Sequence, residues 1–191
     1  MYRKYHTRGI VISSKIEGGT SRRVNIFTED LGLISAKVQG GQKLDSKLRG
    51  GSQDFSVGEF SLIRGKAGWR VVSARSGQNL FEIFRNQPEK LKIVVNILNL
   101  IKKLIDEEKK QNTLFGVIAI FFKFLEKAKQ NEIALSECLT LMRILHILGY
   151  MRHDPEFTLP LSLEINPEDL RALAPRRAQI TRLINESLKV T

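Results

Sequence analysis

The alternation of apolar and polar residues along the chain changes its period near residue 79. Before that point, short runs alternate with a period of two, which is typical of strands that bury one face. Turn sequences such as "EGGTS" and "EDLG" separate these runs. The pattern therefore predicts five strands, at residues 8–14, 22–28, 33–39, 59–65 and 69–75.

After residue 79 the apolar residues recur at every third or fourth position, which is typical of helices. Gly149 lies where a left-handed residue ends a helix. Asn166 followed by Pro167 is a typical helix start, because asparagine caps the first turn and proline lacks only an N–H that has no helical partner there. We therefore expect helices at about 88–105, 113–129, 132–148, a short one from 167, and 176–189.

These elements predict an α+β chain with two domains. The first, residues 1–78, is expected to be a five-stranded β-barrel, and the second, residues 79–191, an all-α helical domain. A basic barrel of five short strands is typical of the OB-fold. The number of strands alone also fits an SH3-like barrel.

The chain is strongly basic, and the excess lies mostly in the first domain. The whole sequence has 31 Lys+Arg against 20 Asp+Glu, a net charge of +11. Residues 1–78 hold 14 basic and 6 acidic residues, a net of +8. Such a charge favours polyanions, because each neutralised phosphate releases condensed counterions. The first domain is therefore the predicted nucleic-acid-binding part, with simple solubility as the alternative explanation.

No motif in the sequence indicates a catalytic or metal site. The three histidines are scattered without metal-ligand spacing, and the single Cys138 excludes an internal disulfide or a multi-cysteine zinc site. The glycine pairs that bound residues 40–51 fit no phosphate-loop signature. We therefore expect no enzymatic activity, no cofactor and no metal.

The sequence also lacks the signals of a membrane or exported protein. It has no apolar run long enough to cross a bilayer, and the N-terminus "MYRKYHTRGIV" has no signal-peptide core. We expect a cytoplasmic protein, associated with the nucleoid and not with a membrane.

Binding chemistry is concentrated in the first domain. Single-strand binders combine a cationic groove with aromatic faces on which bases stack. The stretch "GGQKLDSKLRGG" (40–51) predicts a basic loop, and Trp69 is either a stacking platform or a core residue. The predicted nucleic-acid-binding residues are Arg8, Arg22, Arg23, Lys37, Lys43, Lys47, Arg49, Arg64, Trp69 and Arg70.

Four short motifs follow one another in the first domain: "GIV" at 9–11, "FT" at 27–28, "ISA" at 34–36 and "KLRG" at 47–50. Together, over residues 8–55, they resemble the N-terminal domain of the RecO family of recombination mediators. In that family this domain is an OB-fold that binds DNA, and the loop after its third strand is basic.

The resemblance implies an activity and a set of partners. It implies binding of single- and double-stranded DNA and annealing of complementary strands. It also implies a role with RecR in loading RecA onto single strands coated by single-strand-binding protein (SSB). SSB would be engaged through its acidic C-terminal tail, for which Lys123, Lys127 and Arg143 are candidate contacts.

Among the departures from the family pattern, two bear on the basic loop and on zinc. Gln39, Gln42 and Asp45 lie at positions that are often basic in the family, which weakens the predicted basic loop. Many members carry a four-cysteine zinc ribbon after an "LGY"-like helix end, whereas no cysteine follows residues 148–150 here. Zinc is therefore not expected.

Two other functions remain open from the residues. A free-standing OB-type binder of single-stranded nucleic acid would bind without accelerating annealing or recognising the SSB tail. A structural or interaction protein with an acidic protein partner would bind DNA only weakly, and this binding would disappear near physiological salt.

Overall fold

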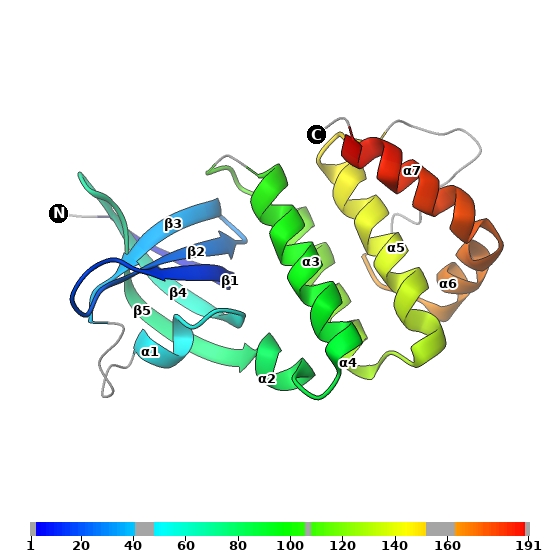
Figure 1. The fold of residues 1–191 in the computed structure, drawn as a ribbon. Helices are drawn as coiled ribbons and strands as arrows, with labels where there is room; N and C mark the ends of the chain where they lie inside the picture. The colour runs from blue at the N-terminus through cyan, green and yellow to red at the C-terminus, as the bar shows by residue number, and fades with distance from the viewer. Residues whose placement is uncertain (1–2, 41–47, 106–107, 152–162, 190–191) are drawn as a thin grey trace. The chain divides into compact units, whose positions relative to one another are not determined.

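The computed structural model describes residues 3–40, 48–105, 108–151 and 163–189. It divides into two compact units, Met1–Asn112 and Thr113–Thr191. In the first unit five strands form a closed barrel in the order β1-β2-β3-β5-β4 (Figure 1). The strands are β1 (Lys4–Ile16), β2 (Arg22–Thr28), β3 (Gly32–Val38), β4 (Ser56–Gly65) and β5 (Gly68–Asn79).

The way the barrel closes distinguishes between the two predicted barrel types. β3 and β5 pair in parallel through Ala36–Trp69 to Val38–Val71, and β1 closes the ring by pairing with β4 in antiparallel fashion. A closed five-stranded barrel with this order is an OB-fold. The α+β prediction, with an OB-fold followed by helices, is therefore confirmed.

The period-two alternation of the strands fills the barrel. Inward residues from all five strands form one buried cluster, because successive side chains of a strand point to opposite faces. Its members are Val11, Val24, Ile26, Ile34, Ala36, Val38, Phe60, Leu62, Trp69, Val71 and Ala74.

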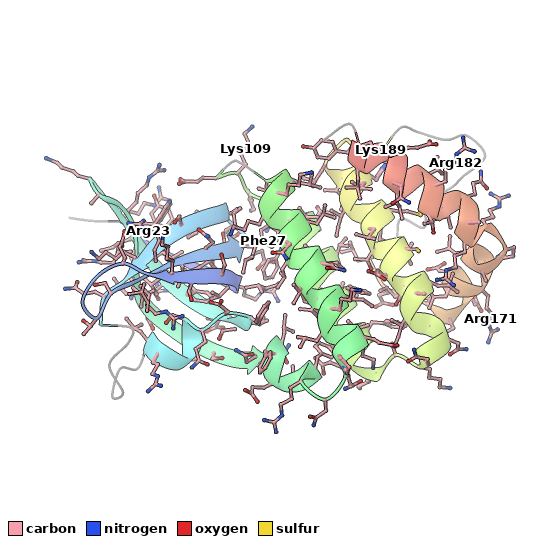
Figure 2. All side chains as sticks on the ribbon, viewed as in Figure 1. Arg23, Phe27, Lys109, Arg171, Arg182 and Lys189 are labelled. Atoms are coloured by element: carbon pink, nitrogen blue, oxygen red, sulfur yellow. The ribbon has the colours of Figure 1, made fainter. Side chains whose placement is uncertain are left out.

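Part of the outer barrel surface is also buried. Phe27 lies on the opposite face of β2 from Ile26 and still has no exposed surface. Figure 2 shows Phe27 at the end of β2 next to α3 (Pro88–Leu104), and Arg23 nearer the other end of the strand. Lys102 of α3 donates a hydrogen bond to the Ser13 hydroxyl of β1 at 3.3 Å. This part of the barrel surface is therefore not open to solvent.

Two short helices in the first unit are not predicted by the sequence pattern. α1 (Leu48–Gly51) packs against β5, and α2 (Leu80–Phe84) begins after Asn79, whose side chain caps it. The amide of Asn79 also donates to the Asp54 carbonyl at 3.0 Å, which ties the chain after α1 to the end of β5. Helices of four or five residues are too short to establish a helical period.

The strand-to-helix change occurs where the sequence predicts it, at Asn79, but the first compact unit continues to Asn112. The helices α2 and α3 therefore group with the barrel. A nucleic-acid-binding role for residues 1–78 and a partner-binding role for 79–191 stay predictions.

The second unit is helical, as expected. Its α5 packs against α6 and α7, and Gly149 has the left-handed φ of 77° that the predicted helix end requires. None of the described helices combines the length and apolarity needed to span a membrane. The elements are α4 (Asn112–Lys127), α5 (Gln130–Ile147), α6 (Pro167–Leu173), the 3₁₀ turn η1 (Ala174–Arg176) and α7 (Arg177–Lys189).

Candidate nucleic-acid interface

Four cations form one row across four neighbouring strands of the barrel. Lys15 of β1 is opposite Arg23 of β2, Arg23 is opposite Lys37 of β3, and Lys37 is opposite Arg70 of β5. Adjacent strands lie about 4.8 Å apart, so the row extends over about 14 Å. Like charges directly opposite each other destabilise a sheet. A bound polyanion would relieve this repulsion.

One member of this cation row is partly neutralised. Arg23 donates from Nε to a carboxylate oxygen of Glu17 at 2.8 Å, and Glu17 lies in the turn between β1 and β2. Lys15, Lys37 and Arg70 form no ion pair with the other described residues. Among the described residues, these three exposed cations of the row therefore carry charge that no carboxylate neutralises.

A groove of about 560 Å³ opens where the row reaches Lys37 and Arg70. It lies at the end of the barrel where the β1–β2 turn and the β4–β5 turn converge, the place where OB-folds bind oligonucleotides. Gly68, with a φ of +93°, closes the tight β4–β5 turn. The groove is lined by the cations Lys37, Lys66 and Arg70, the polar Ser21 and Gln39, and the apolar Ile63 and Ala67, among others.

Trp69 supports this groove from the barrel core. It is only 5% exposed, although it contributes to the groove lining. Its ring meets Tyr5 edge to face, with 5.2 Å between centroids, and the Arg64 guanidinium lies 5.4 Å from its ring centre. Of the two roles open from the sequence, the structure favours core packing over an exposed stacking platform. Trp69 can still hold Arg64 in place through the cation–π contact.

Several of the residues predicted to bind nucleic acid lie in or beside this groove. Lys37, Trp69 and Arg70 line the groove, and Arg64 lies between two residues that line it, Ile63 and Gly65. Arg22, one residue before the cation row, is half-buried and donates to the Ser14 hydroxyl.

The basic loop is only partly described. Lys43 and Lys47 lie outside the described residues, and Arg49 is half-buried in α1. Gly51, at the end of α1, sits so close to β5 that an added Cβ would lie 2.7 Å from that of Ala74. The end of the loop is therefore anchored to β5.

Arg8 lies away from the groove. It donates from Nε and Nη2 to the two carboxylate oxygens of Glu29, each at 2.8 Å. This hydrogen-bonded pair holds the pKa of Glu29 below its ordinary value. Arg8 lines a separate depression of about 500 Å³, together with Glu29, Asp30 and Glu59. The carboxylates of Glu29, Asp30 and Glu59 make this depression unfavourable for a phosphate.

The three candidate contacts for an acidic tail differ in accessibility. Lys123 and Lys127 are exposed and lie one turn apart on α4, so they share one face. Arg143 is 4% exposed and donates to the carbonyls of Leu163 and Glu164, both at 3.1 Å. The Arg143 guanidinium therefore holds the segment that leads into α6. Of the three candidate contacts for the acidic tail, only Lys123 and Lys127 are accessible.

Lys15 and Lys66 are not among the nucleic-acid-binding residues predicted from the sequence. The structure places Lys15 in the cation row and Lys66 in the lining of the groove. Both are basic residues of the first domain, and only the strand register and the turn geometry distinguish them from the others. No group of three metal-binding side chains occurs among the described residues.

The barrel matches one family of known proteins. Residues 1–75 match the family model described as "Recombination protein O N terminal". The chain is 27% identical over 152 residues to the DNA repair protein RecO of Alkaliphilus metalliredigens, covering 80% of this chain and 60% of that relative. It is 32% identical over 133 residues to that of Synechocystis sp., covering 66% and 46%.

These similarities continue beyond the barrel into the helices, since the longest exceed the 75 residues of the family match. The chain spans less than two thirds of the length of the relatives it matches. The resemblance noted in the sequence is thus confirmed: residues 1–75 match the RecO N-terminal family model, and the chain is similar to the RecO DNA repair proteins of these organisms.

Proposed function

We propose that this chain binds single- and double-stranded DNA on the barrel and anneals complementary strands. The observation that carries the proposal is the row of Lys15, Arg23, Lys37 and Arg70, which leads into the cationic groove. A row of neighbouring cations suits a ligand that presents several phosphates in succession. A binder of this kind reads little sequence, because phosphate contacts carry no base identity.

The groove favours an unpaired strand at one end of the interface. Lys37, Lys66 and Arg70 supply partners for phosphates, while Ile63 and Ala67 offer an apolar surface to an unstacked base. A duplex, whose bases are not free, would use the cation row through its phosphates alone.

Annealing requires no catalytic group in this proposal. Two complementary strands repel each other as polyanions, and a cationic surface lowers that repulsion while holding the strands near one another. The net charge of +8 over residues 1–78 supplies such a surface.

The proposed partners are those that the resemblance to the RecO family implies. We propose that the chain acts in the cytoplasm with RecR to help load RecA onto SSB-coated single strands. The exposed pair Lys123 and Lys127 on α4 is the proposed contact for the acidic SSB tail.

The annealing rate of two complementary labelled oligonucleotides, near physiological salt, tests the proposal. We expect the protein to accelerate annealing clearly over the protein-free rate. Binding without acceleration would favour the free-standing OB-type binder instead. Absence of binding would mean that the basic charge serves another purpose, such as solubility or an acidic protein partner.

The basic loop gives a second expected result. Changing Lys43, Lys47 and Arg49 together to glutamate should weaken binding to DNA of any sequence and flatten its salt dependence, because phosphate contacts are lost. Titrations at several salt concentrations measure both effects. An unchanged affinity and salt slope would remove the loop from the interface.

A further inference from the structure

The segment Glu108–Gln111, which follows α3, lies against the barrel. Glu108 forms an ion pair with Arg64 of β4 at 3.1 Å, and Lys110 lies 3.9 Å from a carboxylate oxygen of Asp30. The backbone N–H of Gln111 donates to the carbonyl of Glu29 at 3.3 Å. We call these four residues the strap. Figure 2 shows Lys109 of the strap projecting outward, beyond the end of α3.

Arg64 is the point where the strap meets the proposed interface. Its guanidinium lies over the Trp69 ring, and its chain neighbours Ile63 and Gly65 line the groove. The side chain of Arg64 is 60% exposed, so a phosphate in or beside the groove can approach it. The indole covers one face of a planar guanidinium, and hydrogen bonding takes place at its edges. The Glu108 carboxylate lies 3.1 Å from Nη1, one of the nitrogens at these edges.

We propose that the strap is a built-in competitor of DNA, in which the Glu108 carboxylate holds a phosphate-binding position on Arg64. This inference rests on the proposed DNA binding by the barrel. A carboxylate and a phosphate present similar anionic oxygens to a guanidinium, so they compete for the same N–H groups. DNA binding at Arg64 displaces Glu108.

The ion pair between Arg64 and Glu108 is weak enough for a DNA phosphate to displace the Glu108 carboxylate. Both partners are partly exposed, 60% and 38%, and exposed ion pairs contribute little stability in water. The two other contacts of the strap, from Lys110 and Gln111, do not involve Arg64, so they keep Glu108 close after it is displaced. The strap therefore lowers affinity for weak or isolated anions more than for a strand that makes several contacts at once.

The test compares Glu108→Gln with Glu59→Gln in the full chain, using a labelled single-stranded oligonucleotide and fluorescence anisotropy at low salt. Glu59 is exposed and lies 3.9 Å from Arg75, away from the groove. Each variant removes one negative charge and releases one arginine. We expect Glu108→Gln to bind about two- to five-fold more tightly than Glu59→Gln, the range for one exposed charge pair.

A second pair of variants locates the effect. In an Arg64→Gln background, Glu108→Gln should no longer tighten binding, because the contested guanidinium is gone. Equal affinities for Glu108→Gln and Glu59→Gln, or a gain that persists without Arg64, would overturn the strap while leaving DNA binding intact. Failure of the unaltered chain and of Glu108→Gln to bind at low salt would instead overturn the proposed function.

Discussion

Changing Lys37, Lys66 and Arg70 together to glutamate should lower the affinity for single-stranded DNA about 100-fold near 0.1 M salt. These three cations line one groove, and two of them belong to the row across the strands. Their side chains point to solvent, so the change should leave the fold intact. It removes the densest part of the proposed interface.

The size of the effect follows from counterion release. Each phosphate neutralised on a single strand contributes about 0.7 to the slope of log affinity against log salt. Losing three contacts should therefore reduce that slope by about 2, which corresponds to about two decades of affinity at about 0.1 M salt. The slope is the sharper measurement, because a general loss of folded protein would lower the affinity without flattening the slope.

A matched variant separates the interface from overall charge. Arg171, Arg177 and Lys189 are exposed residues of α6 and α7, and changing them to glutamate alters the net charge equally. We expect this control to lose only a small part of the affinity. Equal losses in both variants would mean that the barrel groove is not the site and that only the net charge matters.

The barrel could be predicted because its physical signal is local. A strand that buries one face alternates with a period of two, and Val24 and Ile26 illustrate this with fully buried side chains. The short helices α1 and α2 escape this kind of reasoning because they are held by tertiary contacts, such as those of Asn79 and Gly51. Their residues carry no period that a sequence pattern could reveal.

The candidate site was predictable in composition and not in arrangement. A basic first domain is visible in the sequence, but the row of Lys15, Arg23, Lys37 and Arg70 depends on the register of three strand pairs. The burial of Trp69 depends on the direction in which β5 enters the barrel. The contact between Arg64 and Glu108 joins residues far apart in the chain, so no spacing rule could indicate it.

The largest expected effect on stability comes from Gly58→Ala. Gly58 is in β4 beside a register shift, opposite Ser76 of β5. A Cβ added there would lie 2.1 Å from the carbonyl oxygen of Arg75, which is a backbone atom of the paired strand. Because β5 is paired with both β4 and β3, it cannot move away without disturbing the closed barrel. We expect a loss of about 3 kcal/mol or more in the free energy of unfolding, at the upper end for overpacking.

Gly77→Ala is the matched control for this prediction. Gly77 lies nearby in β5, and a Cβ there would meet only the Val57 carbonyl oxygen at 3.5 Å, an ordinary contact. Its free energy of unfolding should change by about 0.5 kcal/mol or less. Urea unfolding of the two variants and the parent measures the difference. Similar stabilities for the two variants would mean that β4 and β5 can separate at Gly58, in which case the β4–β5 edge that carries Arg64 and the groove is less rigid than its pairing indicates.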